Sequence, residues 1–429
     1  MHGLVTAVTV GVLSFGQDAL NQNPAADREN VTRDPTSVEF VGSVGQLDVP
    51  NPWVADAGSI EVDGAVTEDL WSTAPLLTGF TQFDPVEGVP ATQRTEARVL
   101  ITDDAILFAV RAFDNDPGGI RATLGDRDSY ERSDDYIRFV MDTFNDRRRA
   151  YVIMVNPLGV QQDGLWVEGG GGRGRGRGFG PPIDWDPDFV WESAGQLHDW
   201  GYSVEVKVPF KSLRFREIPV QDWGFQIERR IQRNGYGESW APVTENVANK
   251  MEQFGSLTGL RDLDPGLFLE INPVQTLNRQ GRYDSDVGAF QHDAITGDFG
   301  MNVTYGLTSN LTLDGTFNPD FSQVEADAGQ IQVNERFPVF FREKRPFFLE
   351  GTEIFNLPRQ LVYTRSIVNP VGGAKLTGKV GSFNVGYLGA VDDVIDPDDL
   401  DAFAKPVVNL LRVRRDLGTS SNFGMVYTD

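Results

Sequence analysis

The sequence contains no cysteine and only three histidines, His2, His198 and His292. Without cysteine, the chain cannot form disulfide frameworks, cysteine-ligated zinc sites or iron–sulfur clusters, and it cannot use thiol catalysis. Basic residues are also scarce, because 38 lysines and arginines stand against 62 aspartates and glutamates, giving a net charge of −24. Such acidity opposes binding through bulk charge to nucleic acid, so no nucleic-acid partner is expected.

The sequence also lacks a long hydrophobic run. No stretch reaches the roughly 18 consecutive apolar residues of a membrane-spanning helix, although transmembrane β-strands are only about 10 residues long and alternate, so they escape that criterion. The apolar run from Leu4 to Phe15 resembles the core of a secretory signal. Residues 1–19 are therefore predicted to be a signal peptide, with a first buried strand as the alternative. Residues 20–56, rich in Asn, Asp, Pro, Ser and Gly, are interpreted as an exported linker.

Glycine, aromatic residues and short segments of alternating apolar and polar residues are abundant. Alternation with a period of two is typical of half-buried strands and predicts an all-β protein. Between residues 57 and 264 the spacing of these segments and their turns predicts an antiparallel β-sandwich, with Trp71 in its core. The expected strands are 98–101, 106–114, 136–142, 150–156, 201–208, 224–230 and 255–260.

A second group of alternating segments predicts a partial, membrane-type β-barrel over residues 265–429. Two hairpins, 301–317 and 374–391, are separated by a long polar excursion, and outward apolar residues such as Phe383 and Tyr387 favour a barrel wall. The chain stops at Asp429 inside an alternating segment. Because an unpaired strand leaves open backbone edges, which a membrane barrel cannot have, the chain is predicted to be a fragment of a longer protein.

Two parts of the chain resemble known families. NPDFSQVEAD at 318–327 and NERFPVFFREKRPFFLEG at 334–351 resemble the signature of an uncharacterised bacterial outer-membrane barrel family, domain-of-unknown-function family 5916. VDGAVTEDLW at 62–71, the hairpin 98–114 and GYSVEVKVPFKSL at 201–213 resemble a family 9 carbohydrate-binding module. These resemblances imply an outer-membrane location in a Gram-negative bacterium, with the sandwich periplasmic or surface-exposed. They also imply a poly- or oligosaccharide ligand, contact with outer-membrane lipid, and structural calcium.

Sugar binding by a sandwich requires exposed aromatic rings, because the C–H faces of a pyranose stack on them while carboxylates and amides bind the hydroxyls. Three tryptophans flank a glycine-rich loop, residues 169–182, where their rings are expected to face solvent. The predicted carbohydrate-binding residues are Trp166, Trp185 and Trp191, with Asp163 and Asp184 as hydroxyl partners.

Closely spaced aspartates in loops offer the oxygen ligands that calcium requires. No EF-hand spacing is present, and solvated turns are the alternative, since Asp and Asn favour turns without any metal. The predicted ligands of a structural calcium ion are Asp114, Asp116, Asp134 and Asp135.

The expected function is glycan binding at the outer membrane, without chemistry. The first alternative is a hydrolase of O-glycosyl bonds in carbohydrate catabolism, which needs two carboxylates about 5 to 9.5 Å apart. Its candidates are Glu343 with Glu350 or Glu325, although the charges around Glu343 can equally pair with one another. The second alternative is a transport or secretion accessory whose sandwich contacts protein. It predicts no exposed aromatic platform near Trp166 and Trp185.

Overall fold

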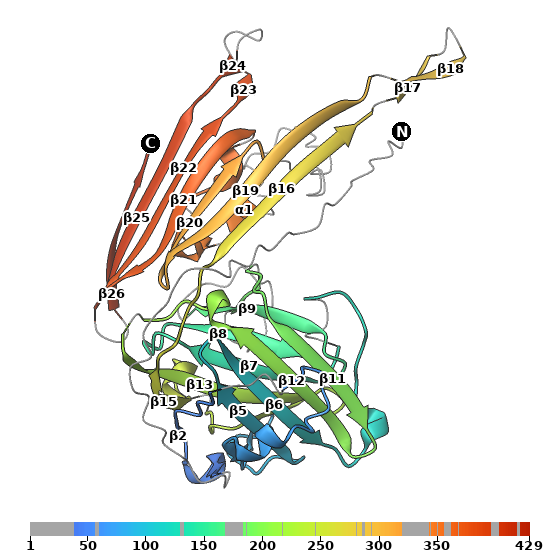
Figure 1. Cartoon of the computed structure of the whole chain (residues 1–429), viewed down its shortest axis with the longest axis vertical. Helices are drawn as coiled ribbons and strands as arrows, with labels where there is room; N and C mark the ends of the chain where they lie inside the picture. Colours follow the sequence, from blue (N-terminus) through green and yellow to red (C-terminus); the bar gives the residue numbers. More distant parts are fainter. Residues whose placement is uncertain are drawn as a thin grey trace. The chain divides into compact units, whose positions relative to one another are not determined.

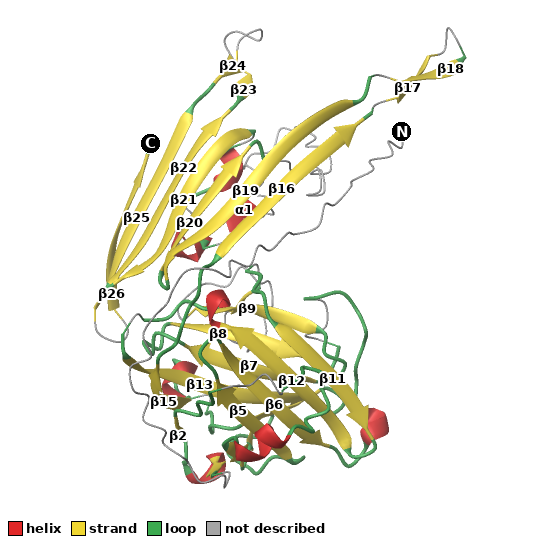
Figure 2. Ribbon diagram, in the orientation of Figure 1, coloured by secondary structure: helices red, strands yellow, loops and turns green. Residues whose placement is uncertain are grey.

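The computed structural model is all-β with short helical turns, and the chain divides into two compact units between Leu267 and Phe268 (Figures 1 and 2). The predicted signal peptide lies outside the described residues and stays a prediction. The described residues are 38–55, 60–128, 133–167, 183–185, 187–216, 218–244, 246–279, 281–284, 288–292, 294–319, 343, 345–349, 351–355, 362–367, 369–395, 403–417 and 421–429. No helix in these stretches has the length and apolar character needed to cross a membrane.

The first unit is a sandwich, and one of its layers is a six-stranded sheet. Neighbouring strands in this sheet are antiparallel, except that the first two in the order below are parallel. The strand order is β1 (Glu39–Val41), β3 (Leu76–Thr78), β5 (Thr95–Ile101), β6 (Ala105–Phe113), β12 (Gly201–Pro209) and β11 (Glu192–His198).

The second layer is a nine-stranded sheet. The strand order is β10 (Ile183–Asp184), β9 (Gln161–Val167), β8 (Arg149–Val155), β7 (Tyr136–Asp142), β13 (Val220–Ile231), β14 (Tyr236–Ser239) and β4 (Thr81–Asp84). β15 (Gly255–Arg261) also pairs with β13, and β2 (Asp48–Pro50) adds to β15 in parallel. The interpretation of residues 20–56 as a linker is therefore wrong for β1 and β2, which join one sheet each.

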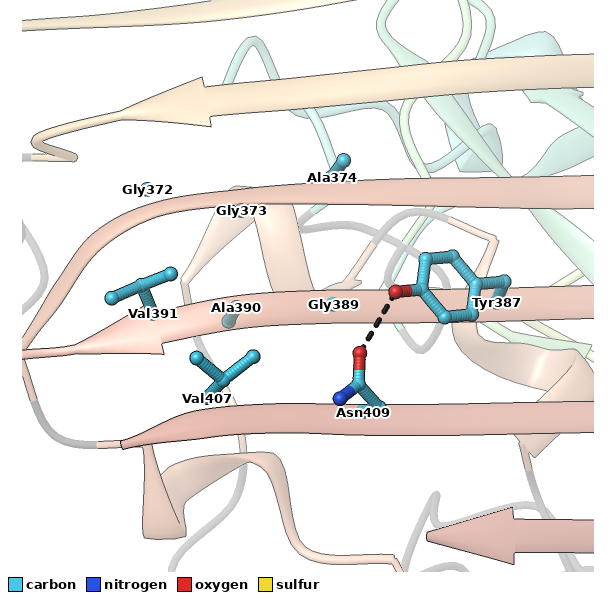
Figure 3. Close-up of a pocket in the computed structure, with 9 residues that line it drawn as sticks. All are labelled: Gly372, Gly373, Ala374, Tyr387, Gly389, Ala390, Val391, Val407 and Asn409. Carbon is cyan, nitrogen blue, oxygen red and sulfur yellow. Dashed lines mark hydrogen bonds between the residues drawn. The ribbon is translucent and has the colours of Figure 1, made fainter. Parts of the chain in front are cut away.

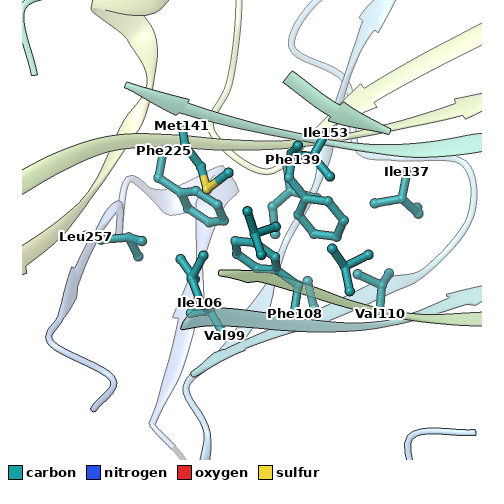
Figure 4. Packing of buried hydrophobic residues seen from close by; sticks show 14 of the residues in the cluster. Val99, Ile106, Phe108, Val110, Ile137, Phe139, Met141, Ile153, Phe225 and Leu257 are labelled. Atoms are coloured by element: carbon teal, nitrogen blue, oxygen red, sulfur yellow. The ribbon is translucent and has the colours of Figure 1, made fainter. Parts of the chain in front are cut away.

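The core lies between the two sheets, where alternate residues of facing strands interdigitate (Figure 4). Phe108 of β6 stacks on Phe139 of β7 and Phe225 of β13, with ring centroids 4.4 and 5.6 Å apart. Trp71, in the 3-10 turn Asp69–Thr73, covers Leu107 and its neighbours in a separate buried cluster. The predicted sandwich is confirmed, and Trp71 is buried as predicted, but in this separate cluster and not in the core between the two sheets.

The second unit contains a seven-stranded antiparallel meander. Its strands are β16 (Leu269–Asn278), β19 (Thr296–Thr308), β20 (Leu311–Phe317), β21 (Pro370–Val380), β22 (Phe383–Asp392), β25 (Val407–Leu417) and β26 (Ser421–Thr428), in this order across the sheet. The predicted hairpins are confirmed. As described, the sheet is open and not closed into a barrel, so a complete barrel wall stays a prediction.

Short elements accompany this sheet. Beyond the end of β16 lies the small hairpin formed by β17 (Gly281–Asp284) and β18 (Ala289–His292). A second small hairpin is formed by β23 (Val394–Ile395) and β24 (Phe403–Ala404). Within the excursion between β20 and β21 lie α1 (Pro346–Leu349), η6 (Thr352–Phe355) and η7 (Thr364–Ser366).

Candidate functional site

Two of the three tryptophans predicted to form a sugar platform are buried. Trp166 on β9 is 3% exposed and packs edge-on against Phe254, with ring centroids 5.6 Å apart. Trp191 is 5% exposed and belongs to the core between the sheets, while Trp185 is half-buried against the cluster that contains Trp166. The prediction that these rings face solvent is wrong for Trp166 and Trp191, because both faces of the nine-stranded sheet are covered near β9.

The two predicted hydroxyl partners have other surroundings. Asp163 is buried, pairs with Arg127, and accepts a hydrogen bond from the Phe189 backbone N–H at 2.7 Å. Burial raises the pKa of Asp163 to about 6, although Arg127 and the Phe189 hydrogen bond oppose that rise. Asp184 is half-buried on β10, where its backbone pairs with Leu165. Asp163 is therefore an internal ion-pair partner and does not face solvent.

Arg127 is the centre of this acidic cluster. Its guanidinium also lies 2.8 Å from an Asp188 oxygen and 3.8 Å from an Asp128 oxygen, and it sits over the Trp191 ring. The oxygens of Asp128, Asp163 and Asp188 lie within 4.8 Å of one another. Since the arginine already supplies the positive charge, the arrangement is an ion-pair cluster.

The predicted calcium ligands form no common set in the described part of the chain. Asp114 binds both terminal nitrogens of Arg233, at 2.6 and 2.8 Å. Asp134 accepts hydrogen bonds from the Thr123 backbone at 2.7 Å and from the Asn156 amide at 2.9 Å. The groups of carboxylates that come within 4.8 Å, Asp63/Glu68/Glu205 and Asp128/Asp163/Asp188, include none of Asp114, Asp116, Asp134 and Asp135. Calcium binding stays a prediction, while Asp114 and Asp134 act as anchors for the loops that contain them.

The loop that opens the sandwich, residues 62–71, is anchored on β12 by one carboxylate. Glu205 is buried and accepts hydrogen bonds from the Gly64 N–H at 2.9 Å, the Asp63 N–H at 3.1 Å and the Trp71 indole at 2.8 Å. Gly64 has φ of +86°, and a Cβ there would lie 2.8 Å from the backbone nitrogen of Gly195 on β11. The VDGAVTEDLW motif is thus a structural clamp on the outer face of the six-stranded sheet.

Beside this clamp, near the β11–β12 turn, lies a partly exposed stack of aromatic rings. The Trp200 indole is parallel to the His198 imidazole, with centroids 4.4 Å apart, and it contacts Phe113 at 5.0 Å. The Arg94 guanidinium also lies over the Phe113 ring, 4.8 Å from its centroid. Among the described tryptophans, Trp200 is the one that belongs to no hydrophobic cluster. We call His198, Trp200 and Phe113 the aromatic stack.

Hydrogen bonds fix the protonation pattern of the aromatic stack. The Ser203 hydroxyl donates to the Gly64 carbonyl at 2.6 Å, so the His198 Nε2 atom, 2.7 Å from that hydroxyl oxygen, must be the donor to it. In the neutral ring, Nδ1 is then an acceptor. No described residue binds His198 Nδ1 or the Trp200 indole N–H. The stack offers a donor, an acceptor and ring surface together, which is the chemistry that a pyranose requires.

The sequence pattern does not single out these three rings. Phe113 ends one hairpin strand and His198 with Trp200 forms the tip of another, so the three rings converge only through the pairing of β6 with β12. The available signal was the aromatic pair His198 and Trp200 at a turn between two alternating segments. A turn that carries two rings is more exposed than a strand, and this criterion distinguishes Trp200 from Trp166.

In the second unit, the seven-stranded sheet exposes its apolar face and covers its polar face. On the apolar face Phe423 is 72% exposed, whereas Lys375 on the polar face is fully buried. Large contiguous apolar patches are rare on soluble monomers and mark contact with protein or membrane. The larger exposed residues of this face are Leu269, Ile271, Phe299, Tyr305, Leu313, Phe317, Phe383, Tyr387, Phe423, Met425 and Tyr427.

A hollow on the apolar face lies where small residues meet (Figure 3). The Tyr387 ring lies along Gly389, where a Cβ would come 2.7 Å from the phenol oxygen. The Tyr387 hydroxyl donates to the Asn409 side-chain oxygen at 2.8 Å. The phenol hydroxyl therefore has its hydrogen-bond acceptor within this part of the face. The lining residues are Gly372, Gly373, Ala374, Tyr387, Gly389, Ala390, Val391, Val407 and Asn409.

The polar face is covered by the described parts of the excursion between β20 and β21, which we call the plug. Lys375 donates to the Phe347 carbonyl at 2.8 Å and pairs with Asp314 at 3.4 Å, so backbone of the plug binds the sheet directly. Its apolar contacts form one buried cluster. The plug contributes Phe347, Phe348, Ile354, Phe355 and Ile367, and the sheet contributes Leu388, Ala390 and Leu410.

Glu343, a candidate catalytic carboxylate, accepts hydrogen bonds from two other residues of the plug. Arg345 donates to both of its oxygens, at 2.7 and 2.8 Å, and the Thr364 hydroxyl donates at 2.6 Å. Burial alone would raise the pKa of Glu343, but these hydrogen bonds hold it below its usual value. This geometry matches the alternative in which the charges of this segment pair with one another. Glu350 and Glu325 lie outside the described residues.

Comparison with known families finds one family model that matches part of the second unit. Residues 279–378 match the model described as "Domain of unknown function (DUF5916)". The match contains the 318–351 stretch, so the predicted resemblance is confirmed over these residues. No curated protein matches the chain.

Several solved structures are similar to about half of the chain. A family 9 carbohydrate-binding module from Caldicellulosiruptor kristjanssonii in complex with glucose is 14% identical, covers 51% of this chain and 98% of its own, and has a TM-score of 0.34. The family 9 module from that organism in complex with cellotriose is 15% identical, covers 50% of this chain and 95% of its own, and has a TM-score of 0.34. A putative carbohydrate-binding protein from Bacteroides uniformis is 12% identical, covers 49% of this chain and 98% of its own, and has a TM-score of 0.37.

Proposed function

We propose that the chain is a glycan-binding protein of the outer membrane of a Gram-negative bacterium. In this proposal the seven-stranded sheet forms part of a β-barrel wall, and the sandwich, periplasmic or surface-exposed, captures poly- or oligosaccharide. The observation that carries the membrane assignment is the exposed apolar face of a sheet whose polar face is covered.

Lipid is the occupant that this apolar face fits best. Burying the exposed part of each large side chain in an apolar phase contributes roughly 1 kcal/mol, about half of the value for a whole side chain. The strands also have suitable lengths, since β16, β21, β22 and β25 contain 10, 11, 10 and 11 residues, and a tilted membrane strand needs about 9–11. Alternation with apolar residues outside and polar residues inside is the pattern of membrane barrels.

The aromatic stack supports the saccharide assignment. It combines ring surface with an unused indole donor and an unused imidazole acceptor at a turn. The alternative of a protein-contacting sandwich predicted no exposed platform near Trp166 and Trp185, and among the described residues there Trp166 is buried and Trp185 is half-buried. The position of Trp200 in a separate, partly exposed stack favours sugar over protein, because a stack with free hydrogen-bonding groups suits hydroxyls.

Membrane insertion is tested by refolding the chain in the presence of liposomes and floating the vesicles after a wash with 6 M urea. The proposal expects the chain to stay with the vesicles, because its apolar face is embedded. Recovery of the chain in the urea wash would contradict it. A variant with Tyr387→Glu and Phe423→Glu is the matched control and is expected to lose the association.

A further inference from the structure

The polar face of the seven-stranded sheet holds a buried guanidinium with no anionic partner. Arg412 on β25 is 7% exposed, and no described residue gives it a hydrogen bond or an ion pair. Its Nε atom is a buried donor without an acceptor. An unpaired buried charge costs several kcal/mol relative to water, so such a group calls for an anion.

The other cations on this face do have partners. Lys375 pairs with Asp314 at 3.4 Å, and Lys379 pairs with Asp416 at 3.5 Å. Arg414 shares Asp416, at 3.6 Å. Arg412 is the exception among the cations described on β21 and on this face of β25, in a chain whose net charge is −24.

A second arginine, Arg414, lies beside Arg412 on β25. It follows Arg412 by two residues, so both side chains leave β25 on the same face, roughly 7 Å apart at the backbone. Its Nε atom is buried without a hydrogen-bond acceptor, and an Asp416 oxygen lies 3.6 Å away, at ion-pair distance. On the neighbouring β26, Arg414 is paired with Gly424, which adds no side chain to this face. Two adjacent guanidiniums repel each other unless an anion lies between them.

The plug borders this pair of arginines. Arg412 is paired across the sheet with Gly386 of β22, and a Cβ at Gly386 would meet Ile354 at 2.6 Å and Phe355 at 2.9 Å. The arginines therefore lie at the edge of the apolar contact between plug and sheet. The apolar side chains on one side of the arginines lower the local dielectric constant, and a low dielectric constant strengthens any ionic interaction made there.

We propose that Arg412 and Arg414 form an oxyanion-binding site on the covered polar face of the sheet. The planar guanidinium fork matches a carboxylate or a phosphate group through paired N–H···O hydrogen bonds. The chemistry is shared by a free inorganic oxyanion and by the charged group of an acidic saccharide. This site is independent of the neutral-sugar chemistry of the aromatic stack.

The test is calorimetric titration of the full chain, refolded in detergent, with inorganic phosphate and, separately, with galacturonate, at constant ionic strength in chloride. Saturable binding of either probe is expected, and it should weaken about tenfold or more in Arg412→Gln, the loss of one charge-assisted contact. Arg415→Gln is the matched control, because Arg415 lies on the opposite face over Phe383 and should leave binding unchanged. Binding of both probes indicates a general oxyanion site, and binding of galacturonate alone indicates an acidic saccharide.

A thermal measurement separates this proposal from a structural role. Without phosphate, Arg412→Gln should melt at a higher temperature than the parent, because it removes an unpaired buried charge, and phosphate should raise the melting temperature of the parent alone. Failure of the folded parent to bind either probe would overturn the proposal. A lower melting temperature for Arg412→Gln in phosphate-free buffer would also overturn it, because Arg412 would then have a partner within the protein. If Arg412→Gln does not fold, Arg412→Lys replaces it and should bind phosphate more weakly than the parent. Equal binding by Arg412→Lys and the parent would count against the fork geometry.

Discussion

The imidazole of His198 stacks on the indole of Trp200 with centroids 4.4 Å apart and planes inclined by 8°. Two hydrogen bonds orient the imidazole. His198 donates to the Ser203 hydroxyl, and that hydroxyl donates to the Gly64 carbonyl in the loop of residues 62–71. The VDGAVTEDLW motif therefore orients the aromatic stack through Ser203. Its glycine accepts the hydrogen bond that orients the Ser203 hydroxyl, and through it the histidine.

Replacement of Trp200 by alanine should weaken saccharide binding. Titration of the full chain with cello-, xylo- and chito-oligosaccharides, with and without calcium, is expected to show saturable binding that weakens at least tenfold, roughly 1.4 kcal/mol, in Trp200→Ala. Trp185→Ala is the matched control, because Trp185 packs half-buried against a core cluster. A folded parent that binds none of these sugars would refute the saccharide assignment.

Replacement of Glu205 by alanine should destabilise the sandwich by roughly 2–5 kcal/mol, because it leaves the Gly64 N–H and the Trp71 indole buried without an acceptor. Glu205→Gln keeps one acceptor oxygen and should cost less. All eight tryptophans precede residue 268, so tryptophan fluorescence during urea unfolding reports on the sandwich within the intact chain. Equal midpoints for Glu205→Ala and the parent would show that the clamp contributes nothing.

Stability of the sandwich should depend on pH through Asp142. This carboxylate is fully buried, and burial raises its pKa to about 6, with Asp146 adding to the rise and Arg147 opposing it. The folded chain therefore binds the proton more tightly than the unfolded chain. The resulting contribution to stability is fully present below the unfolded pKa of about 4 and is lost as the pH rises through about 6.

The matched variant is Asp142→Asn, which cannot ionise. Between pH 4.5 and 7.5 the free energy of unfolding of the parent should fall relative to this variant by roughly 2 kcal/mol. Other titrating groups are common to both chains and cancel in the difference. A difference that stays constant across this range would mean that Asp142 does not titrate there.

Much of the fold follows from local patterns in the sequence. The hairpins β5–β6 and β19–β20 were predicted, because alternation defines each strand and a polar turn ends it. The strands β1 and β2 were missed, since each has three residues and pairs in parallel with a distant segment. Pairing of that kind leaves no local signal.

The site was less accessible to sequence reasoning. Alternation shows which residues share a face but not whether another element covers that face, so Trp166 was expected outside and is inside. The contact between Glu205 and Gly64 joins residues 141 positions apart. The lack of an anion at Arg412 depends on every neighbour across three strands, and only the assembled sheet contains that information.

The most direct test of the account uses the absence of cysteine, which allows one label to be placed at a chosen position. Tyr305→Cys and Thr304→Cys introduce spin labels on adjacent residues of β19 that face opposite sides of the sheet. In liposomes, the label at 305 should collide with lipid-dissolved oxygen and be shielded from a water-soluble nickel complex, whereas the label at 304 should not show this lipid pattern. Equal exposure of both labels to the nickel complex would contradict a lipid-facing sheet.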